Sequence, residues 1–132
     1  MGDLFCAATI YLVTPGSIAR LETRLRTKRW AEVLIAAPLA MDPERLAVAG
    51  AFGESTPVTR PDIHDGPSLG RALESLADLH RGETVAVVAP AAAIEAALGV
   101  AEADDDAFAV TIDFDGRSVQ RLVADEADEH RP

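Results

Sequence analysis

Two stretches of the chain are apolar without polar alternation, which is typical of parallel strands buried on both faces. They span residues 9–13 and 84–88, and a third stretch of strand-forming residues spans 32–36. Pro15 and Gly16 stop the first stretch, and the next residue, Ser17, is a common helix N-cap. The pattern predicts a buried strand that turns sharply into a helix.

Helices are expected after the first and second strands. The first is predicted from Ser17 to about Lys28, with Ser17 as its N-cap. The second is predicted from Asp42, where an N-cap residue, a proline and an acid follow one another, to Gly53. The apolar face of the first helix consists of Ile18, Leu21 and Leu25.

Two more helices are expected in the second half of the chain. Ser68 is the candidate cap of the third, which ends near His80, and Pro90 stands just before the fourth. A histidine at a helix end is more often matched to the helix dipole than a ligand. The apolar stripes are Leu69, Leu73 and Leu76 in the third helix and Ile94, Ala97 and Leu98 in the fourth.

The C-terminal part alternates apolar and polar positions, which predicts an antiparallel hairpin. Its strands are expected at 107–114 and 118–123, with a tight turn at Asp115 and Gly116. Prolines flank a short strand at 57–60, which places it near a sheet edge, and 62–67 is expected to be a loop. We therefore predict one three-layer α/β domain over residues 1–124, with a mainly parallel mixed sheet between two helical layers, and a charged tail over residues 125–132.

Composition agrees with a single domain of this class. The chain has 132 residues and only 5% aromatic residues, so its core must be built from alanine, valine, leucine and isoleucine. A formal net charge of −10 argues against nucleic-acid binding, which depends on lysine and arginine neutralising phosphates.

Cys6 is the only cysteine, which excludes an internal disulfide and favours the reducing cytoplasm. We interpret it as a buried free thiol. Asp3 is acidic and precedes the first apolar run, so no targeting signal is expected there. The apolar stretch 84–101 contains Pro90, Glu95 and Gly99, which indicates a strand and a helix and not a membrane span.

Residues at the ends of two predicted strands resemble a known family. Residues 12–17 read Leu-Val-Thr-Pro-Gly-Ser, and residues 82–92 read Gly-Glu-Thr-Val-Ala-Val-Val-Ala-Pro-Ala-Ala. The chain is similar here to the histidine phosphatases, which include the cofactor-dependent phosphoglycerate mutases. Their corresponding motifs read Leu-Val-Arg-His-Gly-Glu and Val-Val-Ser-His-Gly-Gly. The resemblance extends over residues 8–123 in the order of strands and helices, and this family also closes its sheet with a hairpin.

The resemblance implies a fold that has lost its catalytic groups. Thr14 and Pro15 stand where the family has its arginine and nucleophilic histidine, and Pro90 stands where it has the second histidine. Residues 36–41 match a Ser-Ser-Pro-Leu motif and a later phosphate-binding arginine, whose place is taken by Met41. Proline has neither an ionisable side chain nor a backbone N–H.

One acidic residue matches the family loosely. Members have a Leu-x-Glu element after the third strand that supplies the proton donor, and Ile63, His64 and Asp65 occupy that place. Asp65 would then be the acid. The alternative, which we favour, is a turn residue before Gly66. The family's insertion over the active site is nearly absent.

These substitutions predict a pseudoenzyme that acts through contacts with another protein or with a copy of itself, without cofactor or metal. The candidate docking residues are Ala37 and Ala92, and the basic segment 20–29 is the next candidate surface. The predicted vestigial pocket consists of Thr14, Pro15, Gly16, Ser17, Met41, Asp65, Pro90 and Ala91.

Two other hypotheses come from different functional classes. A sensor would bind a small anion at the amide groups of the helices that begin near Ser17 and Ala91. An enzyme with different chemistry would recruit Cys6, Ser17, His64 or Asp65, but sequence spacing does not assemble them into a triad or a metal site.

Overall fold

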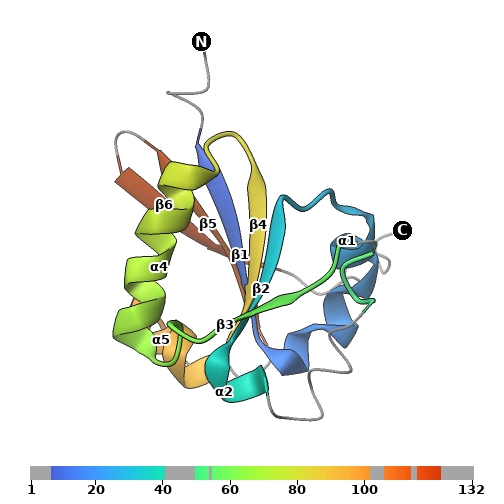
Figure 1. Ribbon diagram of the computed structural model, residues 1–132, viewed down its shortest axis with the longest axis horizontal. Helices are drawn as coiled ribbons and strands as arrows, with labels where there is room; N and C mark the ends of the chain where they lie inside the picture. Colours follow the sequence, from blue (N-terminus) through green and yellow to red (C-terminus); the bar gives the residue numbers. More distant parts are fainter. Residues whose placement is uncertain (1–6, 41–49, 54, 102–105, 114–115, 123–132) are drawn as a thin grey trace, which may run out of the picture.

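The computed structural model describes residues 7–40, 50–53, 55–101, 106–113 and 116–122. These residues form a six-stranded sheet with strand order β3-β2-β4-β1-β5-β6, and helices cover both of its faces (Figure 1). The expected three-layer α/β fold with a mixed sheet and a terminal hairpin is confirmed.

Parallel pairing joins the first four strands. β4 (Thr84–Val88) pairs with β1 (Ala8–Val13) and β2 (Glu32–Ala36), and β2 pairs with β3 (Val58–Arg60) at the sheet edge. β1, β2 and β4 are almost entirely buried, which explains why their sequences do not alternate.

The hairpin completes the other side of the sheet. β5 (Ala107–Asp113) is antiparallel to β1, and β6 (Gly116–Arg121) is antiparallel to β5. β6 begins two residues earlier than the sequence pattern predicts, because Gly116 already pairs with Asp113. Phe114, Val123 and the predicted tail lie outside the described residues.

α4 (Gly66–Leu79) and α5 (Ala91–Leu98) cover one face of the sheet. The predicted leucine stripe of α4 is fully buried and lies in one apolar cluster with residues of β1, β2, β4, β5 and α5. Replacing such a buried leucine with alanine typically costs about 2–5 kcal/mol. None of the helices in the described segments is long and apolar enough to cross a membrane.

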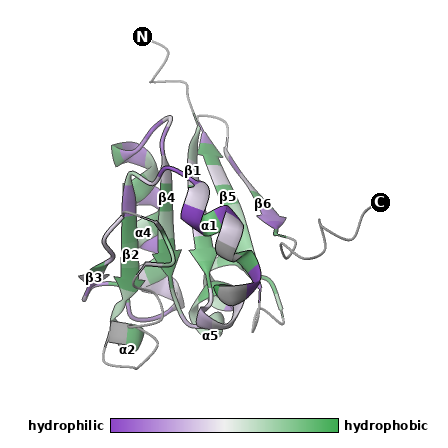
Figure 2. Ribbon diagram, turned by 90° about the vertical axis from the view of Figure 1, so that its right-hand side faces the viewer, coloured by the Kyte–Doolittle hydropathy of each residue, from purple (hydrophilic) through white to green (hydrophobic). Residues whose placement is uncertain are grey.

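The opposite face carries α1 (Glu22–Thr27), which lies in front of the sheet in Figure 2. Most of the aromatic residues described also lie on this face. Trp30 packs edge-on against Tyr11 and Phe52, with ring centroids 5.1 and 5.4 Å away. Its Nε1 donates a hydrogen bond to the Leu25 carbonyl at 2.8 Å, so its polar atom is satisfied inside the core.

The predicted start of the first helix, at Ser17, is wrong, because the α-helix begins at Glu22. Two single 3₁₀ turns, η2 (Pro15–Ser17) and η3 (Ala19–Leu21), precede α1. Leu21, with φ −118° and ψ 21°, departs from α-helical geometry and separates η3 from α1. Ser17 ends η2 and is not an N-cap. The predicted apolar face is nevertheless buried, because Ile18, Leu21 and Leu25 all lie in the core.

The third helix begins three residues earlier than predicted, at Gly66, with Asp65 as its N-cap and Ser68 at its third position. The cap role expected of Ser68 is therefore wrong, whereas His80 does end the helix. A short helix, α2 (Ala37–Ala40), follows β2 directly. The helix predicted from Asp42 falls largely outside the described residues.

Candidate functional site

The carboxyl ends of the parallel strands meet at one edge of the sheet, and most of the predicted pocket residues lie there. Val13 is paired with Val88, and the Ala89 amide donates to the Val13 carbonyl at 3.0 Å. The Ala37 amide donates to the Ile63 carbonyl at 2.8 Å, which brings the loop before α4 to the same edge. We call residues 14–17, 37, 65 and 90–92 the strand-end surface, at the lower edge of Figure 1.

The two hydroxyl groups of the strand-end surface are buried and already bonded. Thr14 is fully buried, and its Oγ1 donates to the Asp106 carbonyl at 3.0 Å. Ser17 is 1% exposed, and its Oγ donates to the Thr14 carbonyl at 2.9 Å. Neither hydroxyl is directed toward a ligand or toward a base that would activate it as a nucleophile.

Pro15 and Pro90 are half-buried and follow adjacent strands. Pro90 is the N-cap of α5, and its carbonyl accepts hydrogen bonds from the Ala93 and Ile94 amides at 3.0 and 3.2 Å. The structure thus places the two prolines at the ends of neighbouring strands. Both are used to turn the chain, and neither has a group that accepts a phosphoryl group.

Asp65 is the N-cap of α4, a structural role that differs from the turn residue we favoured, because the helix already begins at Gly66. Its Oδ1 accepts hydrogen bonds from the Ser68 amide at 2.9 Å and the Ser68 hydroxyl at 2.8 Å, and the Asp65 amide donates to the Ser68 Oγ. These hydrogen bonds from Ser68 lower the pKa of the Asp65 carboxyl group below its usual range. A general acid needs the opposite shift.

A shallow depression of about 300 Å³ lies between the first turns of α4 and α5. It is lined by His64, Asp65, Gly66, Pro90, Ala92 and Ala93. The two helices approach closely here, since a Cβ atom on Gly66 would lie 2.4 Å from the Cβ of Ala96. In the described part of the chain, no group of three or more histidine, cysteine, aspartate or glutamate side chains is arranged so that it could hold a metal ion.

The candidate docking residues differ in exposure. Ala92 is exposed and Ala37 is half-buried, whereas Ala89 is fully buried between them and the core. Gly16 is exposed beside Pro15. The strand-end surface therefore presents small, uncharged groups, apart from Asp65. Met41, which was predicted to belong to it, lies outside the described residues.

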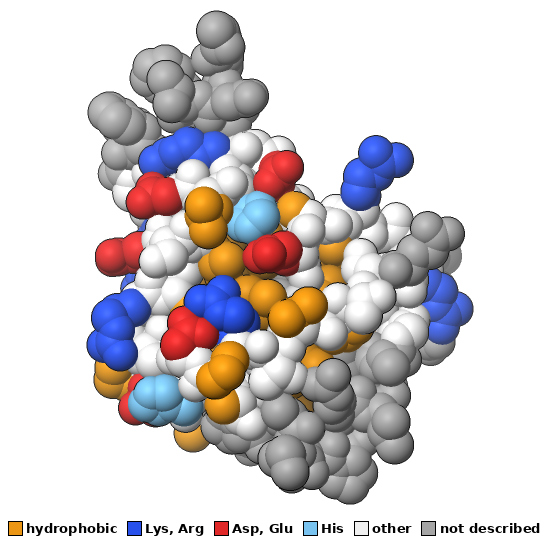
Figure 3. Space-filling view, viewed as in Figure 1, with side chains coloured by type: hydrophobic (Ala, Val, Ile, Leu, Met, Phe, Trp, Pro, Cys, Tyr) orange, Lys and Arg blue, Asp and Glu red, His pale blue; other side chains and the backbone are white. Residues whose placement is uncertain are grey.

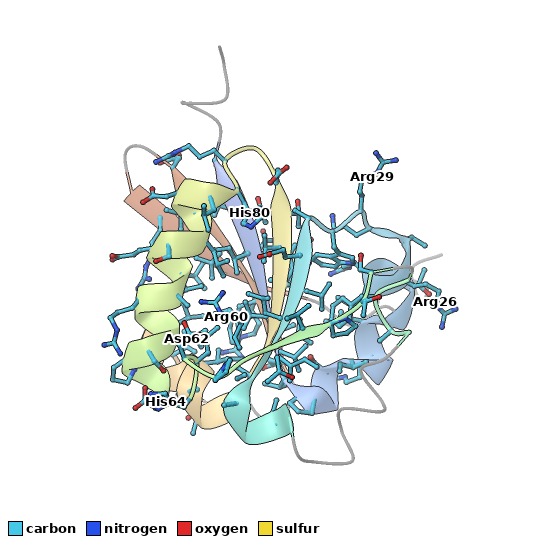
Figure 4. The ribbon with its side chains drawn as sticks, viewed as in Figure 1. Arg26, Arg29, Arg60, Asp62, His64 and His80 are labelled. Carbon is cyan, nitrogen blue, oxygen red and sulfur yellow. The ribbon has the colours of Figure 1, made fainter. Side chains whose placement is uncertain are left out.

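Arg60, the last residue of β3, forms an ion pair with Asp62. Arg60 donates from Nε and Nη2 to the two carboxylate oxygens of Asp62 at 2.8 and 2.7 Å (Figure 4). This pairing raises the pKa of Arg60 and lowers the pKa of Asp62. Viewed from the α4 side, basic and acidic side chains are interspersed and do not form a broad positive surface (Figure 3).

Sequence reasoning missed a charged cluster at the opposite end of the strands. His80 lies between two acids: its Nδ1 is 2.8 Å from Glu83 Oε1, and its Nε2 is 3.2 Å from Glu32 Oε1. The three-residue spacing to Glu83 was visible in the sequence. The contact with Glu32, 48 residues away, depends on the pairing of β2 with β4.

The basic segment 20–29 lies on the α1 side of the molecule. Arg26 and Arg29 point outward there, away from His64 and the strand-end surface (Figure 4). Lys28 lies over the Tyr11 ring, with its Nζ 5.3 Å from the ring centroid. Arg24 and Arg26 stand in the last turn of α1, where cations favour the helix dipole as expected.

No family model matches the chain, and no curated protein matches its sequence.

Proposed function

We propose that this chain is a non-catalytic, histidine phosphatase-like domain that acts by binding another protein at the strand-end surface. The observation that carries the proposal is the pair of prolines, Pro15 and Pro90, at the ends of two adjacent parallel strands. Ligands of α/β proteins usually bind at this edge of the sheet. Among the described residues of the strand-end surface, the hydroxyls of Thr14 and Ser17 are bonded to carbonyls, and the acid, Asp65, caps a helix.

The order of elements supports membership in the resembled family. The chain begins with a strand, helical turns and a second strand, and a third strand follows at the sheet edge. α4 and α5 then precede and follow β4 in the chain, and a hairpin closes the sheet. This is the order that the resemblance implies. The single cysteine, Cys6, favours the cytoplasm as the place where the protein works.

The first test is chemical. The purified protein is expected not to hydrolyse aryl phosphates or sugar phosphates above background, and no phosphohistidine is expected to form. Turnover that survives repurification and disappears in His64→Ala or Asp65→Ala would overturn the proposal, because these are the ionisable side chains beside the depression.

The second test concerns the docking surface. Ala92→Arg places a bulky charge on an exposed helix position of the strand-end surface, and we expect it to reduce recovery of a stoichiometric partner at least about tenfold, equivalent to ~1.4 kcal/mol. Ser75→Arg is the matched control, an exposed position of α4 outside this surface. Equal recovery with both variants would exclude the strand-end surface and direct attention to segment 20–29. Unchanged thermal unfolding midpoints would exclude misfolding as the cause.

The depression between α4 and α5 favours a second candidate, a sensor of small anions. Two helix N-termini point their positive dipole ends toward it, and His64 lies at its rim. The other amide site, expected near Ser17, is weaker because Pro15 has no N–H and the Ser17 amide donates to the Thr14 carbonyl at 3.0 Å. Titration with inorganic phosphate should shift the amide resonances of Ala91–Ile94 if this candidate is correct. Unchanged resonances would eliminate it.

A further inference from the structure

We draw no further inference here: the strongest candidate, the depression of about 300 Å³ at the amino ends of β2 and β4 that is lined by Arg29, Trp30, Ala31, Gly82, Glu83 and Thr84, carries nothing because the Glu83 carboxylate is already bonded to His80 and nothing in the structure shows which ligand or partner the depression would take.

Discussion

The two ends of the parallel strands are held together by different forces. At the carboxyl ends, the chain turns through Pro15 and Pro90, the hydroxyls of Thr14 and Ser17 bond to carbonyls, and α4 touches α5 at Gly66. These contacts are close, and the ion pairs Arg60–Asp62 and His64–Asp65 lie at the same end. At the amino ends, by contrast, His80 links the end of α4 to two acids on other segments.

This difference bears on function, because α/β proteins usually bind ligands at the carboxyl ends of their strands. In this chain a cluster of one imidazole and two acids lies at the amino ends, around His80, whereas the carboxyl ends hold separate ion pairs such as Arg60 with Asp62. At the carboxyl ends α4 also packs closely against α5 at Gly66, and Asp65 caps α4. The comparison predicts that a change in packing has the larger effect at the carboxyl ends and that loss of the imidazole has the smaller effect at the amino ends.

The largest effect is expected from a steric change at the carboxyl end. Gly66→Ala would place a Cβ 2.4 Å from the Ala96 Cβ, so α5 must move away from α4. We expect the free energy of unfolding to fall by about 1–3 kcal/mol, as for other overpacked contacts. Chemical denaturation of both proteins measures this difference.

Gly70→Ala is the matched control, because it makes the same substitution in the same helix. Its added Cβ has no neighbour within 4 Å, so the higher helix propensity of alanine should stabilise the protein by up to about 1 kcal/mol. If the two variants changed stability by the same amount and in the same direction, close packing at Gly66 would not be what holds this end together.

A smaller effect is expected from removing the imidazole at the amino end. His80→Ala should lower the free energy of unfolding by about 1 kcal/mol, since the imidazole is mostly buried but its carboxylate partners are half-exposed. The loss should shrink in concentrated salt, which the loss in Gly66→Ala should not.

Two variants sharpen this prediction. His64→Ala, which removes an exposed imidazole near the other end, should change stability by less than about 0.5 kcal/mol. In a double-mutant cycle, Glu32→Gln should lower the free energy of unfolding less in the His80→Ala protein than in the parent. Additive costs would mean that the contact between His80 and Glu32 contributes nothing measurable.

The buried strands were predictable because each is an uninterrupted run of apolar, strand-forming residues. β2 and β4 have the predicted bounds, since burial on both faces demands uninterrupted apolar residues. The edge position of β3 followed from its flanking prolines. That Pro15 and Pro90 follow neighbouring strands could not be predicted from the strand patterns, because these do not determine which strands pair.

The helix beginnings were less predictable, because several residues compete for each cap. Asp65 and Ser68 are both good cap residues three positions apart, and the structure uses them together in a capping box. Pro67 in the first turn was the overlooked signal, because proline favours that place. The break at Leu21 has no comparable signal, since Ile18, Leu21 and Leu25 are spaced as in a continuous helix.

The smallest effect concerns the charge on Asp65, and it tests whether this residue is a cap or an acid. Its pKa is lowered in the folded protein by the hydrogen bonds from Ser68, so the ionised form stabilises the fold. That contribution is fully present above the pKa of the unfolded chain, about 3.9, and is lost as the pH falls through the lower, folded value. Asp65→Asn keeps a capping side chain but does not titrate. The unfolding midpoints of the parent and Asp65→Asn should therefore differ by a constant amount between about pH 5 and pH 7, and the parent should lose its advantage below about pH 4. A parent that instead gained stability relative to Asp65→Asn on acidification would show a raised pKa, as a proton donor requires, and would return Asp65 to the candidates for catalysis.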